Sequence, residues 1–185
     1  MPLPAPAPRT LKHTRAVECK GYEREDGLWD IEGHLVDTKT YVHSRRDGGR
    51  ERQPGQPVHH MWLRLTIDLD LKIHDVEAVT DTGPYETCGD ITVNFKKLIG
   101  LTIGAGWRKA IAERVGGVLG CTHLVELLGP LGTTAFQATG RAREAHNARK
   151  PATGKKPYQI GSCHIYKEDA PAVKERWPEF YTGKR

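Results

Sequence analysis

Two stretches of this sequence alternate between apolar and polar residues, and this period of two is typical of β-strands with one buried face. In Leu28–Val36 the apolar face carries Trp29, Ile31, Gly33 and Leu35, and the opposite face carries Asp30, Glu32 and His34. In the stretch that begins at His60 the apolar face carries Met61, Leu63, Leu65 and Ile67. Strands of this kind form antiparallel sheets that cover a core with one face and meet solvent with the other.

The second alternating stretch is followed by signals for a hairpin. Asp68–Asp70 supplies turn residues, and Leu71–Thr80 can return as the partner strand. The alternation breaks near Asp75, which predicts a β-bulge there. Gly83 and Pro84 should end the sheet region.

The next third of the chain changes period to three and four residues, which predicts amphipathic helices. The first apolar stripe consists of Trp107, Ala110, Ile111, Val115 and Val118. A second helix should begin at Cys121 or Thr122, with Leu124, Leu127, Leu128 and Leu131 as its buried stripe. Pro130 should stop or kink it, because proline removes a helical hydrogen bond. A third helix is expected near Thr133–Ala148.

The remaining segments complete an α+β fold, in which a small antiparallel sheet is followed by packed helices. The tail predicts a short strand around Tyr158–Tyr166 and a helix near Ala170–Glu175. Residues 1–12 are expected to form a flexible arm, and residues 13–185 a single domain.

Composition limits the classes of function. Apolar residues make up 37% and charged residues 28%, as in globular proteins. No apolar run is long enough for a membrane helix, and the Pro/Ala-rich start does not have the pattern of a secretion signal, so we expect a cytoplasmic protein. The formal charge is +5, but the basic residues do not form a stripe interleaved with aromatic residues. Nucleic-acid binding is therefore not expected. The basic residues in the loops are explained equally well by a small anionic substrate. The sequence also leaves open whether the protein forms a homo-oligomer.

Three of the four cysteines lie in motifs that suit metal binding or thiol chemistry. Cys121, in Gly120-Cys121-Thr122-His123, should begin a helix, where the dipole favours a thiolate. Cys88 precedes Gly89 and Asp90 in an expected turn, which would leave its thiol exposed, and Cys163 is followed by His164. Each motif is also compatible with a plain structural cysteine.

The order of these motifs resembles the U-type iron–sulfur cluster scaffold proteins. The resemblance lies in Cys88-Gly89-Asp90, Gly120-Cys121 and the late Cys163, and covers roughly Met61 to Lys174. It implies a sheet packed on helices and a site formed by Cys88, Cys121 and Cys163, with Asp90 as a further ligand. The chain departs from that family in its long Arg15–Pro57 region and in Lys156-Pro157-Tyr158-Gln159, where the chaperone motif is absent.

The chain as a whole is more closely similar to a bacterial family catalogued as domain of unknown function 2889. The motifs that carry this likeness are Asp26–Gly33, His59-His60-Met61 and Gly120–Leu124 with Glu126. The likeness implies no established activity.

Soft ligands favour zinc or an iron–sulfur cluster as the cofactor. We therefore expect a small metal-dependent lyase or hydrolase acting on an organic, anionic or aromatic substrate. The alternatives are a carrier of clusters or persulfide sulfur, and a purely structural zinc site. Under the enzyme hypothesis, His123 or His59 moves protons, and the loop Arg45–Arg52 neutralises substrate charge.

An acidic group on the first strand offers further candidates for catalysis. Asp30 and Glu32 belong to a cluster with Asp26 and Asp37, whose function would be a general base or a partner for Arg64 or Lys39. Histidines 59 and 60 should point to opposite faces of their strand, so that one of them can enter a site.

Overall fold

The computed structural model describes residues 3–44, 49, 51–149 and 154–183. The chain divides into two compact units, residues 1–147 and 148–185, and each is described by itself. The prediction of a single domain over residues 13–185 stays a prediction. Residues 3–12 are exposed and lie outside any helix or strand.

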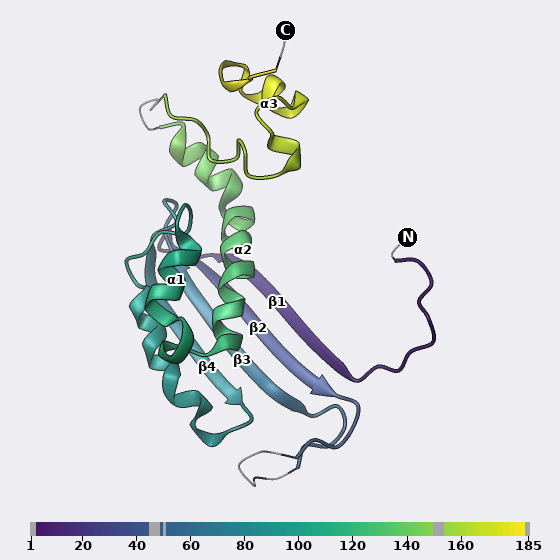
Figure 1. The fold of residues 1–185 in the computed structure, drawn as a ribbon. Coiled ribbons are helices and arrows are strands. Elements are labelled where there is room, and N and C mark those ends of the chain that lie inside the picture. Colours follow the sequence, from purple (N-terminus) through teal and green to yellow (C-terminus); the bar gives the residue numbers. More distant parts are fainter. Residues whose placement is uncertain (1–2, 45–48, 50, 150–153, 184–185) are drawn as a thin grey trace. The chain divides into compact units, whose positions relative to one another are not determined.

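A four-stranded antiparallel sheet forms the first part of the N-terminal unit, in the order β1-β2-β3-β4 (Figure 1). The strands are β1 His13–Glu23, β2 Trp29–Lys39, β3 Pro57–Ile67 and β4 Ile73–Thr82. The α+β prediction is confirmed. The bulge predicted near Asp75 is also confirmed, because the register shifts between the pairs Thr66–Asp75 and Ile67–Ile73. The sequence did not predict β1 as a separate strand. Nearly all side chains of this edge strand are exposed, so its sequence has no clear alternation of apolar and polar residues.

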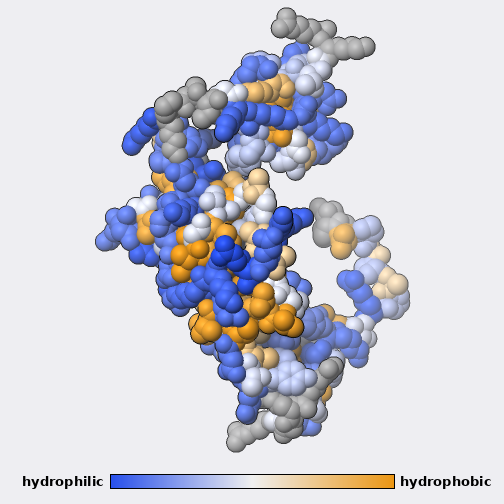
Figure 2. Space-filling view, turned by 60° about the vertical axis from the view of Figure 1, so that its left-hand side comes forward, coloured by the Kyte–Doolittle hydropathy of each residue, from blue (hydrophilic) through white to orange (hydrophobic). Residues whose placement is uncertain are grey.

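The helical elements that follow lie against one face of the sheet (Figure 1). They are the 3₁₀ segment η1 Glu86–Leu98, α1 Trp107–Val115, the short 3₁₀ turn η2 Gly117–Leu119 and α2 Thr122–Asn147. The buried alternating residues of β2 and β3 pack against these helices, and their core includes Phe95, Ile111, Leu124, Leu128 and Leu131. On the face drawn in Figure 2, polar residues predominate and hydrophobic residues form patches among them.

Of the stop or kink expected at Pro130, the stop does not occur. A single helix, α2, runs through this proline to Asn147, so the separate third helix does not exist. Leu127 and Leu128 before the proline and Leu131 and Ala135 after it are all buried against the sheet. This packing on both sides offsets the lost hydrogen bond at Pro130.

Two glycines let α2 approach the sheet closely. A Cβ atom at Gly21 would lie 2.4 Å from the Cβ of Ala138, and one at Gly33 would lie 3.2 Å from Leu131. The odd-numbered residues of β1 and β2 therefore face α2, and the even-numbered residues face away from it.

The C-terminal unit contains the 3₁₀ turn η3 His164–Tyr166, the helix α3 Pro171–Arg176 and the 3₁₀ turn η4 Pro178–Phe180. The predicted helix near Ala170–Glu175 is confirmed. The predicted strand around Tyr158–Tyr166 is wrong, because turns occupy this stretch: Ile160 donates to the carbonyl of Pro157, and Ser162 to that of Gln159. Among the described residues, no helix has the length and hydropathy to cross a membrane.

Candidate metal centre

One end of the sheet carries a row of polar side chains on the face that α2 covers. Arg15 on β1 is paired with Asp37 on β2, and Asp37 is paired with His59 on β3. Directly paired residues lie side by side on the same face of a sheet. Asp37 also continues the buried series that ends with Leu35, so the strand geometry itself directs this carboxylate inward.

Asp37 is buried, with only 1% of its side chain exposed, and both of its oxygens are hydrogen-bonded. Oδ1 accepts from Nε of Arg15 at 2.9 Å and lies 3.1 Å from Nε2 of His13. Oδ2 accepts from Nη2 of Arg15 at 2.8 Å and lies 2.9 Å from Nδ1 of His59. Burial raises the pKa of this carboxyl, but the hydrogen bonds and charge of Arg15 outweigh it, so the net pKa is lowered. Asp37 is therefore ionised at neutral pH.

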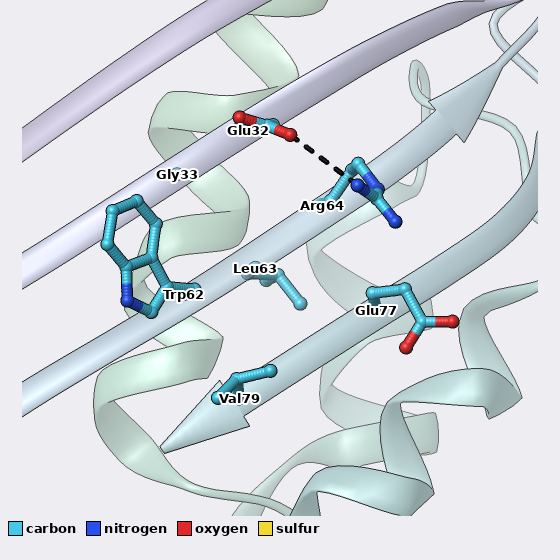
Figure 3. A pocket seen from close by; sticks show the side chains of 7 residues that line it. All are labelled: Glu32, Gly33, Trp62, Leu63, Arg64, Glu77 and Val79. Atoms are coloured by element: carbon cyan, nitrogen blue, oxygen red, sulfur yellow. Dashed lines mark ion pairs between the residues drawn. The ribbon is translucent and has the colours of Figure 1, made fainter. Parts of the chain in front are cut away.

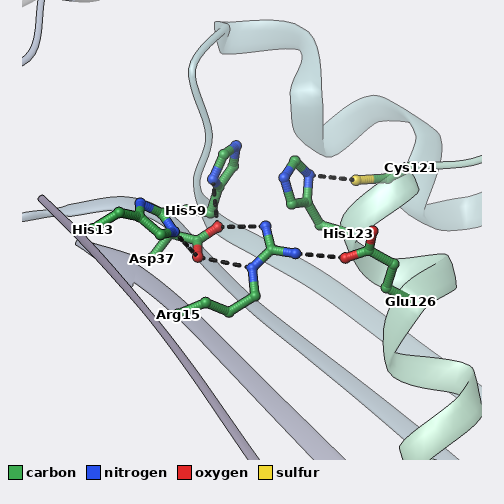
Figure 4. Close-up of polar contacts among 7 residues, drawn as sticks. All are labelled: His13, Arg15, Asp37, His59, Cys121, His123 and Glu126. Atoms are coloured by element: carbon green, nitrogen blue, oxygen red, sulfur yellow. Dashed lines mark hydrogen bonds and ion pairs between the residues drawn. The ribbon is translucent and has the colours of Figure 1, made fainter. Parts of the chain in front are cut away.

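The imidazoles of His59 and His123 face each other above this carboxylate (Figure 4). Their ring centroids are 3.8 Å apart, and His123 comes from the first turn of α2. Burial lowers the pKa of both rings; the charge of His123 further lowers that of His59, and the charge of Arg15 that of His123. Both rings are thus neutral at pH 7, and the contact between His59 and Asp37 is a hydrogen bond rather than an ion pair.

A neutral histidine that donates through Nδ1 keeps a lone pair on Nε2. Because Nδ1 of His59 faces the carboxylate of Asp37, the proton belongs on Nδ1, and Nε2 is the ring nitrogen that can bind a metal. Asp37, His59 and His123 each offer a ligand atom within 4.8 Å of the other two. Within the part of the chain that the structure describes, this is the one group of three or more His, Cys, Asp or Glu side chains that meet so closely.

Cys121 lies at the edge of this group. Its half-buried thiol precedes α2, and Sγ is 3.9 Å from Nδ1 of His123 (Figure 4). Of the predicted site residues, the structure thus brings together His59, His123 and the neighbouring Cys121.

Cys88 and Asp90, two other predicted metal ligands, are not members of this group. Cys88 and Asp90 belong to η1 rather than to the predicted turn, and the half-buried Cys88 packs beside Gly83 instead of presenting an exposed thiol. Cys163 is exposed in the C-terminal unit. In the described residues no cysteine belongs to the ligand group, so the three-cysteine site stays a prediction without support from the geometry.

Asp30 and Glu32 point to the opposite face of the sheet from His59 and His123. Asp30 accepts a hydrogen bond from Thr66 at 2.6 Å, and Glu32 is 3.7 Å from Arg64, the partner that the sequence suggested. Glu32 and Arg64 line a pocket on this open face together with Trp62, Glu77 and Val79 (Figure 3). Trp29 is buried in the core, whereas Trp62 is exposed on the open face.

Three residues of the site were missed as site members: His13, Arg15 and Glu126. Asp37 was assigned to the acidic cluster, with Arg64 or Lys39 as its partner, but its partner is Arg15. The signal that could have found Asp37 is its odd position in β2, which places it on the buried face. Arg45, Arg46 and Arg50 of the proposed substrate loop lie outside the described residues.

A family model described as "Protein of unknown function (DUF2889)" matches residues 13–137, more than half of the chain. The chain belongs to this family. The DUF2889 region contains the whole polar row and its neighbours, from His13 to Glu126, and leaves out the C-terminal unit. No curated protein and no solved structure matches the chain, and the resemblance to the U-type scaffold proteins is not confirmed.

The lowered pKa values of His59 and His123 predict how the metal-free protein responds to acid. In the unfolded chain both rings take up protons near pH 6.5, whereas in the folded protein they do so only at lower pH. The unfolded state therefore binds more protons below pH 6.5, and the free energy of unfolding should fall as the pH drops from about 7 to 5. Urea unfolding at these two pH values measures this loss.

The double variant His59→Gln/His123→Gln should lose less stability over the same interval. His34, whose pKa burial also lowers, remains in this variant and should preserve part of the slope. Exchange of the exposed His164, in the other unit, is the control and should leave the slope unchanged. An equal slope in the double variant and the native protein would contradict the prediction.

Proposed function

We propose that this protein is a small metal-dependent enzyme whose metal centre is built on His59, His123 and Asp37. The observation that carries the proposal is the pair of facing, neutral imidazoles above a buried, ionised carboxylate. Neutral imidazole is the form of histidine that binds metals, so no proton must first be removed at neutral pH.

The charges around the group favour a cation. Arg15 contributes one positive charge, Asp37 and Glu126 contribute one negative charge each, and the two imidazoles are neutral. Before any charge on His13, which also contacts Asp37, these charges sum to −1, although the chain as a whole is basic. A divalent cation would compensate the excess of two carboxylates over one guanidinium and would reverse the sign of the charge.

The donor set suits zinc or a related transition metal. Imidazole nitrogens prefer zinc, iron, nickel or copper, whereas magnesium and calcium prefer sites made of oxygen. Because both oxygens of Asp37 already have partners, we assign this carboxylate to the orientation of His59, as in carboxylate–histidine–metal arrangements. The thiol of Cys121 is the candidate for a third ligand.

Two or three protein ligands leave coordination positions for a substrate, which distinguishes a catalytic from a closed structural site. The metal would act as a Lewis acid that polarises an oxygen of the substrate, consistent with a lyase or hydrolase. The alternative function, a carrier of clusters or persulfide sulfur, needs Cys88, Cys121 and Cys163 to act together, and no contact in the described residues favours it.

Metal titration of the chelator-treated protein tests the proposal. We expect one equivalent of Zn²⁺ to bind in calorimetry, and Co²⁺ to compete for the same site with visible ligand-field absorption. If the thiolate of Cys121 is a ligand, the Co²⁺ form also absorbs in the near ultraviolet, and Cys121→Ser removes this band.

The matched control for this substitution is Cys19→Ser, which alters another half-buried thiol that is not part of the ligand group. This variant should keep the full spectrum. Absence of saturable binding for both metals would refute the metal centre. Iron and sulfide in stoichiometric amounts, in protein purified without oxygen, would favour the carrier instead.

A further inference from the structure

We propose that the substrate of this site carries a carboxylate group and that this carboxylate binds Arg15 in the place now taken by Glu126. The inference deepens the proposed function, because it names the class of substrate for the same site. It depends on the hydrogen bonds of Arg15, which are present without a metal.

The guanidinium of Arg15 has two differently placed edges. Nε and Nη2 donate to the two oxygens of Asp37 at 2.9 and 2.8 Å, which is a bidentate contact with a buried carboxylate. Nη1 donates to Oε2 of Glu126 at 2.5 Å. The inner edge, Nε and Nη2, is thus held by the buried Asp37. The outer edge, Nη1, already binds a carboxylate, which is the group that we expect the substrate to carry.

The two carboxylates differ in how readily they can be exchanged. The side chain of Asp37 is 1% exposed, whereas that of Glu126 is 54% exposed. An exposed ion pair contributes little to stability, because water and salt replace it at small cost. A carboxylate from solution can therefore displace Glu126 but not Asp37.

The outer edge of Arg15 lies beside the candidate metal ligands. Glu126 follows His123 by three residues on α2, so the two side chains lie on the same side of the helix. In Figure 4 the imidazoles of His59 and His123 lie on one side of the Arg15 guanidinium, which lies between the carboxylates of Asp37 and Glu126. A substrate held by its carboxylate at Arg15 would place its remaining atoms beside His123.

Titration with sodium benzoate at constant ionic strength tests the inference. The readout is the NMR signal of the Arg15 Nε–H group, followed in the metal-free and in the zinc-loaded protein. We expect a saturable shift with benzoate and none with benzamide, which has the same shape without the charge.

Glu126→Gln is the decisive variant, because it removes the competing charge and keeps the shape of the side chain. It should strengthen benzoate binding by roughly two- to fivefold, the equivalent of an exposed ion pair. Arg15→Lys, which keeps the charge but loses the bidentate edge, should weaken it. Glu113→Gln, on the exposed surface of α1, is the control and should have no effect.

Failure of benzoate to shift the Arg15 signal in metal-free Glu126→Gln protein would overturn the inference, as would equal binding of benzamide. These outcomes are separate from those for the metal. Benzoate binding at Arg15 without any Zn²⁺ binding would refute the proposed function alone, and Zn²⁺ binding without a response at Arg15 would refute the carboxylate site alone.

Discussion

The double variant His59→Ala/His123→Ala is expected to lose Zn²⁺ binding. Exchange of residues that only orient a ligand lowers metal affinity by about 10- to 100-fold, so the loss of two direct ligands should exceed 100-fold. Each single variant should also bind Zn²⁺ more weakly than the native protein. Calorimetry of the chelator-treated proteins, with circular dichroism as the check on folding, measures the effect.

The open face of the sheet offers a matched control for this experiment. His34 and His60 are also neighbours on β2 and β3, with ring centroids 4.9 Å apart, but the carboxylate of Asp81, 3.7 Å from His60, is exposed rather than buried. The variant His34→Ala/His60→Ala removes the same number of imidazoles and should bind Zn²⁺ as the native protein does. Equal loss of Zn²⁺ in both double variants would show that the metal binds surface histidines without selectivity.

The variant Asp37→Asn is expected to have the second large effect, with a decrease in the free energy of unfolding of about 2–4 kcal/mol. The amide has the shape of the carboxylate but only one oxygen. Its NH₂ group would face the donors of Arg15 or His59, so that buried donors would lie against each other. Urea unfolding of the metal-free protein at pH 7 measures the loss.

Two comparisons sharpen the result for Asp37. Glu32→Gln also removes a carboxylate from β2, but this group lies on the open face, 3.7 Å from Arg64, and its exchange should cost less than about 0.5 kcal/mol. If Asp37 orients His59, Asp37→Asn should weaken Zn²⁺ binding by about 10- to 100-fold. Complete loss of Zn²⁺ would instead identify Asp37 as a direct ligand, and unchanged stability would contradict its role in the core.

Much of the framework was predictable, because local periodicity reports which side of an element is buried. The alternation in β2 and β3 gave the correct inward faces, and the bulge at Asp75 and the start of α2 at Thr122 also agree with the structure. The sequence predicted that one of His59 and His60 could enter a site, because neighbours on a strand point to opposite faces, and in the structure that residue is His59. The helix does not stop at Pro130, because packing outweighs the local preference.

The sequence by itself determined β2, β3, β4, α1 and the start of α2, the buried faces of β2, β3, α1 and α2, and the presence of His59 and His123 at the beginnings of β3 and α2. Only the tertiary structure decided that these two residues meet over Asp37. Their positions depend on the register of three strands and on the close approach of α2 at Gly21 and Gly33. Contacts between residues so distant in the chain follow from the packing of the whole core, and no local pattern records them.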